Sequence, residues 1–158
     1  MLVVREFEFF QGEKYMVAWP CDMGGGTFGE DMQDAIESAA DWLYQTVLFD
    51  LIEGKETEGG KLGHEPEHGG KIIVVAVDCD LARANAVTAA DAARLLGVSS
   101  ARVIQMCDNA QLVSWKDGTK RMVLRDSIEQ RLREAPKAGR PRKKQEATQG
   151  SDVAMLRA

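Results

Sequence analysis

The stretch between residues 88 and 112, TAADAARLLGVSSARVIQMCDNAQL, constrains the fold of this chain more than any other. Thr88 is a good helix N-cap, because its hydroxyl can accept a hydrogen bond from an otherwise unpaired amide of the first turn. The apolar residues that follow recur at helical spacing; they are Ala92, Ala93, Leu95 and Leu96. Gly97 ends this helix with the residue type that best tolerates a left-handed backbone, and Ser99 or Ser100 caps a second helix. The pattern predicts two short helices joined by a tight turn.

The second helix separates an apolar face from a polar one. Its inward residues are Val103, Met106 and Cys107, whereas Arg102, Gln105 and Asn109 face outward. This arrangement is typical of a helix-turn-helix, whose second helix enters the major groove of DNA. There Arg can pair with guanine, and Gln or Asn with adenine. We expect base reading by Ser100, Arg102, Gln105 and Asn109.

Two apolar-rich runs follow, at residues 112–115 and 121–124, with Asp117-Gly118 between them. Asp-Gly between such runs predicts a hairpin with a type I′ turn, which needs positive φ. A capping box of Asp126 and Glu129 then predicts a closing helix to about residue 134, with Ile128 and Leu132 inward. Helix, turn, helix, hairpin and helix together indicate a winged helix. The cations around the hairpin tip, expected to contact phosphates, are Lys116, Lys120 and Arg121.

Residues 85–134 resemble the DNA-binding modules of the excisionase and MerR-like families. The matching positions are Ala92-Ala93, Leu96-Gly97-Val98-Ser99, Val103, Leu112 and the basic hairpin. One departure is Ala110, which stands where those families usually have the Gly that ends the recognition helix. A plain helical hairpin with the same apolar spacing is the alternative interpretation.

Charge divides the 158-residue chain into two halves. Residues 1–80 carry 5 Lys and Arg against 17 Asp and Glu, a net charge of −12, whereas residues 81–158 carry 15 against 8, a net charge of +7. The basic half suits phosphate and the acidic half some other partner, although solubility alone is the simpler account. No run is long enough to span a membrane, and no secretory signal is visible. Three widely spaced Cys without a CxxC pair favour free thiols in the cytoplasm.

The acidic half reads as a small sheet with one long helix. Strands are expected at residues 2–9, 15–19 and 27–28, in a meander, and a helix from the cap Asp31 to about Gly54. Residues 55–70 are polar and Gly-rich, which indicates a loop. The continuous apolar run at residues 71–77 predicts a central strand buried on both faces. Residues 78–86 would connect this part to the next.

This order of elements resembles the HicB family of antitoxins, whose domain is a truncated RNase H-like fold. The matching motifs are Tyr15-x-Val17-x-Trp19-Pro20-x-Asp22 and Gly26-Thr27-x-Gly29-Glu30-Asp31-x-x-Asp34-Ala35. Here Cys21 separates Pro20 from Asp22, Gly24-Gly25 replaces a Pro-Gly element, and the loop of residues 55–70 is longer. The resemblance implies a two-part repressor that blocks a small basic RNA-cleaving toxin and binds its own operator. The acidic residues expected to bind the toxin are Asp22, Glu30, Asp34, Glu37 and Asp41.

Catalytic and metal sites are weaker interpretations. The acidic residues Asp22, Glu30, Asp41, Asp78 and Asp80 could serve two-metal nuclease chemistry, but they lie where solvated acids are common. His64 and His68 are four residues apart, yet Pro66 prevents the helix that would align them for a metal ion. We therefore expect no catalytic residue, no metal and no cofactor.

The C-terminal tail is basic and of low complexity, and we expect it to be disordered. Its Gly139-Arg140-Pro141 core resembles an AT-hook, which lies in a narrow A·T-rich minor groove; a general basic tail is the equal alternative. The tail residues expected at the minor groove are Lys137, Arg140, Arg142 and Lys143.

The sequence as a whole predicts an α+β protein with three parts. Residues 1–80 form the acidic, partly RNase H-like domain with a small antiparallel sheet and one long helix, residues 85–135 the winged helix-turn-helix, and residues 136–158 a disordered basic tail. The expected function is an antitoxin-type repressor that binds double-stranded DNA as a homo-oligomer, at least a dimer. A solitary phage- or excisionase-type regulator whose first domain dimerises, and a metal-dependent RNase H-like nuclease, are the alternatives.

Overall fold

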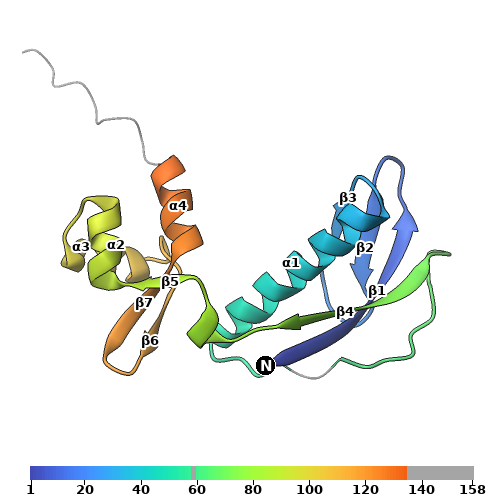
Figure 1. Ribbon diagram of the computed structural model, residues 1–158, viewed down its shortest axis with the longest axis horizontal. Helices are drawn as coiled ribbons and strands as arrows, with labels where there is room; N and C mark the ends of the chain where they lie inside the picture. Colours follow the sequence, from blue (N-terminus) through green and yellow to red (C-terminus); the bar gives the residue numbers. More distant parts are fainter. Residues whose placement is uncertain (58–59, 135–158) are drawn as a thin grey trace, which may run out of the picture.

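The computed structural model describes residues 1–57 and 60–134 of the chain. It is an α+β structure with two sheets, one of four strands near the N-terminus and one of three strands near the C-terminus. Figure 1 shows these as two lobes that meet where the long helix and the strand leading out of the first sheet both end. The α+β class and the small antiparallel sheet with one long helix are as the sequence predicts.

The N-terminal sheet has the strand order β3-β2-β1-β4, and every neighbouring pair is antiparallel. Its strands are β1 (Leu2–Gln11), β2 (Met16–Pro20), β3 (Thr27–Gly29) and β4 (Lys71–Asp78). The predicted meander is confirmed for the first three. Three strands extend beyond their predicted ends: β1 by two residues to Gln11, and β2 and β3 by one residue each, to Pro20 and Gly29. Pro20 is tolerated because it is the last residue of its strand.

One long helix, α1 (Met32–Ile52), covers one face of this sheet. Asp31 caps it, as predicted, by accepting a hydrogen bond from the amide of Asp34 at 2.9 Å. The buried residues of α1 recur every four positions and pack on alternate residues of β1; this core contains Val3, Phe7, Phe9, Ala35, Ala39, Leu43 and Val47. At the start of α1 the backbones approach so closely that a Cβ on Gly29 would collide with Ala35.

The strand predicted at residues 71–77 is present as β4, but the prediction that it is central and buried on both faces was wrong. β4 lies at the edge of the sheet, whereas β1 lies inside it and has buried residues on both faces. In β4 only Val75 is fully buried, whereas Val74 is 52% exposed. An apolar run of this length is compatible with a central strand and with an edge strand. Here the loop of residues 60–70 packs on Glu6 and Glu8 of β1, so it does not cover the outer face of β4.

The C-terminal unit comprises a short connector, a three-stranded sheet and three helices. A 3-10 helix η1 (Leu81–Arg83) leads to β5 (Ala86–Thr88), which pairs with β7 (Lys120–Leu124), and β7 pairs with β6 (Ser114–Asp117). The helices are α2 (Ala89–Leu96), α3 (Ser100–Asp108) and α4 (Arg125–Glu134). The predicted connector thus ends before Ala86, which already belongs to this sheet. In the described residues, none of the helices is both long and apolar enough to span a membrane.

Candidate nucleic-acid interface

The helix pair α2 and α3 forms through the predicted local signals. The hydroxyl of Thr88 accepts a hydrogen bond from the amide of Asp91 at 3.2 Å and caps α2. Gly97 ends α2 in the left-handed region, with φ of 66°. Ser99 then caps α3 by accepting from the amide of Arg102 at 3.2 Å. These contacts confirm the predicted caps, and Ser99 rather than Ser100 is the second one.

A compact apolar core holds the two helices against the sheet and α4. It contains Ala92, Ala93, Val103, Met106, Leu112, Val123 and Ile128. Two predicted core positions were wrong, because Leu95 of α2 and Leu132 of α4 are 44% and 49% exposed. Helical spacing alone places both near the apolar stripe, but among the described residues no further element covers them.

The outer face of α3 carries the predicted base-reading residues. Arg102, Gln105 and Asn109 are exposed, and at about 100° per residue they lie within one narrow stripe. The Nη1 of Arg102 donates a hydrogen bond to Oε1 of Gln105 at 3.3 Å, so these two side chains already point the same way. Ser100 is exposed in the first turn of α3, on a different side of the helix from this stripe. Such a stripe can present hydrogen-bonding groups to the edges of bases.

The hairpin of β6 and β7, which we call the wing (residues 114–124), lies next to α3. Lys116 and Lys120 are exposed and Arg121 is half-buried. The Nη2 of Arg121 donates to Oδ1 of Asp108, the last residue of α3, at 2.8 Å. Lys116 and Arg121 face each other across the hairpin. Among the described residues, Lys116 and Lys120 take part in no ion pair, whereas Arg121 is tied to α3.

The turn of the wing differs from the predicted type. Asp117 pairs with Lys120, so the two turn residues are Gly118 and Thr119. Only Gly118 has positive φ, 59°. A type I′ turn requires positive φ at both central residues, whereas this pattern is that of type II′. The prediction of a hairpin was correct and its turn type was wrong, because Asp117 is still part of the strand.

The ends of α3 and α4 show two further differences. Ala110, just after α3, has φ of 55° and is the single non-glycine residue with positive φ in the described ranges. It therefore adopts the conformation for which related modules use Gly. The helix α4 begins at Arg125, so Asp126 lies inside its first turn and does not form the predicted capping box. Instead, the hydroxyl of Ser127 donates to the carbonyl of Leu124 at 2.7 Å and accepts from the amide of Val113 at 3.1 Å.

A family model described as a helix-turn-helix domain matches residues 86–136. This segment starts at β5 and includes α2, α3 and the wing. The C-terminal unit is a helix-turn-helix domain. It supports a DNA-binding regulator, as the sequence predicts.

No curated protein and no solved structure matches the chain. The HicB-like resemblance of residues 1–80 therefore stays a hypothesis.

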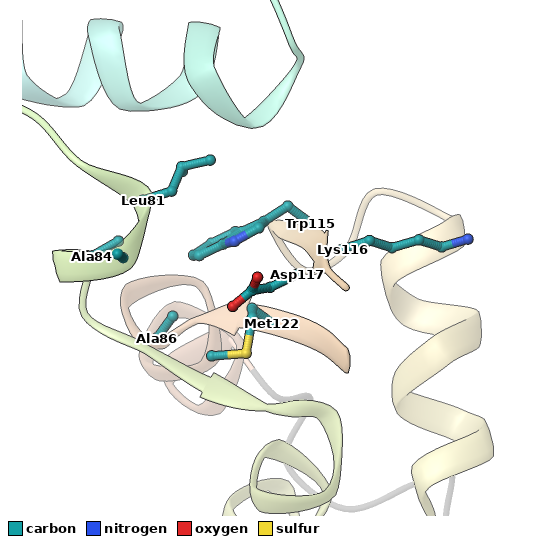
Figure 2. A pocket seen from close by; sticks show the side chains of 8 residues that line it. Leu81, Ala84, Ala86, Trp115, Lys116, Asp117 and Met122 are labelled. Atoms are coloured by element: carbon teal, nitrogen blue, oxygen red, sulfur yellow. The ribbon is translucent and has the colours of Figure 1, made fainter. Parts of the chain in front are cut away.

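The helix-turn-helix domain packs directly on the end of α1. Leu48 of α1, Trp115 of the wing and Leu124 of β7 form one buried cluster, with Ile52 and Leu81 at its border. An open cavity of about 360 Å³ lies beside it, between the connector and the wing. Figure 2 shows the indole of Trp115 between Leu81 and Met122, while the ammonium end of Lys116, whose stem also lines the cavity, extends away from them. No local pattern in the sequence indicates this joint, because Trp115 has the spacing of an ordinary hairpin residue.

The acidic residues expected to bind a partner separate into two groups. Asp34, Glu37 and Asp41 are exposed on one face of α1, three and four residues apart, and Glu30 is exposed just before it. Asp22 lies elsewhere: its carboxylate accepts a hydrogen bond from the amide of Lys61 at 3.0 Å. The first group forms a continuous acidic stripe, which we call the α1 stripe (Glu30, Asp34, Glu37 and Asp41).

A polar cluster that no sequence motif indicates lies on the face of the sheet away from α1. Glu8 in β1 is buried, and its carboxylate accepts hydrogen bonds from the amides of Glu67, His68 and Gly70 at 2.7–3.1 Å. The Nδ1 of His68 lies 2.9 Å from the same carboxylate. Burial raises the pKa of Glu8, but the hydrogen bonds from the His68 side chain and these amides outweigh it and lower the pKa to about 2. Alternation along β1 puts Glu8 on the face away from α1, but its partners lie about sixty residues further along the chain, where no local pattern indicates them.

Glu6, two residues before Glu8 and on the same face of β1, makes the same kind of contacts. Its carboxylate accepts from the amides of Gly63 and His64 at 3.0 and 2.8 Å, and Nδ1 of His64 lies 2.7 Å away. The amides of Gly63 and His64, and then the His64 side chain, lower the pKa of Glu6. Each histidine thus has one ring nitrogen bound to a glutamate, and the two pairs hold the predicted loop on the sheet.

The residues weighed for catalysis or metal binding do not converge. Asp78 binds the N-terminal ammonium at 2.9 Å, and Asp80 caps η1 through the amide of Ala82. Within residues 1–57 and 60–134, no three His, Cys, Asp or Glu side chains are grouped as a metal ion would require. The cysteines Cys21, Cys79 and Cys107 are free. The predicted minor-groove residues, Lys137, Arg140, Arg142 and Lys143, and the expected disorder of the tail lie outside the described residues.

Proposed function

We propose that the protein is an antitoxin-type repressor, in which the helix-turn-helix domain binds an operator and the acidic part binds a small basic RNA-cleaving protein. The observation that carries operator binding is the Arg102–Gln105 pair on the exposed face of α3. Both side chains can make bidentate contacts with base edges in the major groove. Lys116 and Lys120 on the adjacent wing supply positive charge for the DNA backbone.

The α1 stripe supports the second half of the proposal. Glu37 and Asp41 have no cationic neighbour among the ion pairs of the described residues, so their charge faces solvent. A net charge of −12 over residues 1–80 gives the same sign to the surrounding surface. Such a surface attracts a basic protein, speeds its encounter and can occupy the site where that protein would bind RNA.

Selection from a pool of random duplexes with the full-length chain tests operator binding. We expect enrichment of one motif, and binding to it that weakens steeply with salt. Recovery of no motif, with equal affinity for all duplexes, would contradict sequence-specific regulation.

Co-expression with basic proteins encoded beside the gene tests partner binding. We expect a stable complex by size-exclusion chromatography, loss of the partner's RNA cleavage, and no cleavage by the chain alone with Mg²⁺ or Mn²⁺. Charge reversal of Glu37 and Asp41 to Lys should release the partner. The matched control is Glu13→Lys, which changes an exposed acid in the turn between β1 and β2. RNA cleavage by the purified chain would instead favour the nuclease alternative.

A solitary regulator of the excisionase type is the second candidate, and the free edge of β4 favours it. In that case the N-terminal part would only bring two DNA-binding domains together. The two candidates differ in the co-expression experiment, because a solitary regulator binds its operator without any basic partner.

A further inference from the structure

β4 is an edge strand with one unpaired side in the described part of the chain. It pairs with β1 on one side, and in the described part of the chain no strand pairs with its other side. The opposite edge of the sheet, β3, has only three residues, whereas β4 has eight. A long free edge presents a row of unpaired amides and carbonyls that another strand can bind.

The hydrogen bonds at the N-terminus show which residues of β4 face outward. The N-terminal nitrogen of Met1 donates to the carbonyl of Cys79 at 2.7 Å, and the amide of Cys79 donates to the carbonyl of Met1 at 2.9 Å. Such reciprocal pairs alternate along an antiparallel ladder. The register from Leu2 opposite Asp78 to Phe9 opposite Lys71 is continuous, so odd-numbered residues bind β1. The outward backbone groups therefore belong to Ile72, Val74, Ala76 and Asp78.

The features that usually protect an edge are missing from β4. Its sequence, KIIVVAVD, has no proline or glycine, and its charges lie only at the two ends. Val74 and Ala76 are exposed on the face away from α1. On the face toward α1, Ile73 and Val77 are only half-buried at the border of the core. The edge thus leaves apolar surface uncovered on both sides.

We propose that β4 pairs with β4 of a second copy of this chain, antiparallel, to form one continuous eight-stranded sheet. A twofold axis perpendicular to a sheet places one residue opposite itself. With outward groups on even-numbered residues, an axis at Val74 gives hydrogen bonds between the two Val74 residues and between Ile72 and Ala76 of the other copy. The same register places Lys71 opposite Val77 of the other copy, so the two Lys71 side chains lie at opposite ends of the paired strands.

The position of the helix-turn-helix domain favours a second copy over an unrelated peptide. β4 leads straight into η1 and β5, and Leu48 of α1 is buried against Trp115 of the wing. In the proposed pair, the two Asp78 residues would be eight positions apart, about 26 Å at 3.3 Å per residue. Each DNA-binding domain would extend beyond its Asp78, which suits half-sites separated by about 34 Å or a multiple. The choice of a second copy rests on the proposed DNA binding, whereas neither the free edge nor this choice depends on the proposed toxin.

Sedimentation of the full-length chain without DNA or any partner tests the proposal. We expect a dimer of the 17.4-kDa chain in the wild type. Val74→Lys places two like charges at the axis and should raise the dimer dissociation constant at least tenfold. Val74→Pro removes an outward amide without breaking a bond to β1, and should do the same. Trp19→Lys is the matched control, because Trp19 is exposed on the same face of the sheet but two strands away from the edge.

Amide hydrogen exchange gives a second readout that does not depend on mass. The amides of Val74 and Ala76 should exchange slowly in the wild type and fast in Val74→Lys, whereas the amide of Val75 should stay slow in both if the fold is kept. A wild-type chain that stays monomeric at the highest soluble concentration would overturn the proposal. So would a dimer that survives both Val74 variants, or one that Trp19→Lys dissociates while they do not.

Discussion

The guanidinium of Arg121, in the wing, donates a hydrogen bond of 2.8 Å to the carboxylate of Asp108 at the end of α3. This contact joins the two elements that are expected to touch DNA. The Arg121 side chain is 24% exposed, whereas the neighbouring Lys120 has no ion-pair partner in the described residues and belongs to the exposed surface. The two cations, adjacent in sequence, are therefore expected to act differently.

Substitutions of Arg121 and Lys120 should have different effects on the salt dependence of DNA binding. Lys120→Ala should weaken binding to all duplexes similarly and lower the salt slope by about one unit, because one phosphate contact is lost. Arg121→Ala should leave the slope nearly unchanged and lower stability by about 0.2–1 kcal/mol, as for other exposed ion pairs. A double-mutant cycle with Asp108→Ala measures their coupling. A drop in the slope with no coupling would make Arg121 a phosphate contact instead.

Arg102 should read a base rather than the backbone. Arg102→Ala should cost about 1–3 kcal/mol on the selected operator and relax one base position. Arg94→Ala is the matched control, because Arg94 is exposed on α2 and paired with Asp91 at 3.0 Å. Titrations on the operator and on scrambled duplexes measure both. Equal losses on the two kinds of duplex would assign Arg102 to phosphate binding.

Ala110→Gly should stabilise the protein. The left-handed conformation of Ala110 costs a residue with a Cβ about 1 kcal/mol more than Gly. Its side chain is exposed, so no packing is lost. Ala101→Gly, in the exposed face of α3, should destabilise by about 0.5–1 kcal/mol. Urea denaturation measures the change in unfolding free energy for each variant, which should be positive for Ala110→Gly and negative for Ala101→Gly. Equal destabilisation by the two substitutions would show that the backbone at Ala110 is not strained.

Acid stability should depend on Glu8. Its pKa in the folded protein is about 2, below the usual 4.5, so its stabilising contribution is complete above pH 4.5 and is lost as the pH falls toward 2. Glu8→Gln should lower stability at neutral pH and flatten the dependence of the unfolding free energy between these two pH values. Glu13→Gln, which changes an exposed acid, is the control. An unchanged acid transition in Glu8→Gln would show that the loop is held in another way.

The local signals of the chain were sufficient for its helices and most of its strands. Thr88, Gly97, Ser99 and Asp31 cap or end helices through contacts with residues at most four positions away. Such contacts follow from residue type and spacing, so the sequence alone predicted the helix pair, the wing and the long helix. The exposed stripe of Arg102, Gln105 and Asn109 follows from the same helical period.

The tertiary structure decided everything that depends on distant residues. Whether β4 is central or at the edge depends on which strands it meets, and its apolar run is compatible with both. The pairing of Glu8 with His68 and the burial of Trp115 against Leu48 join residues 60 and 67 positions apart, which no local period can specify. Side-chain period determines which way a residue faces, but only the packed chain determines what it meets there.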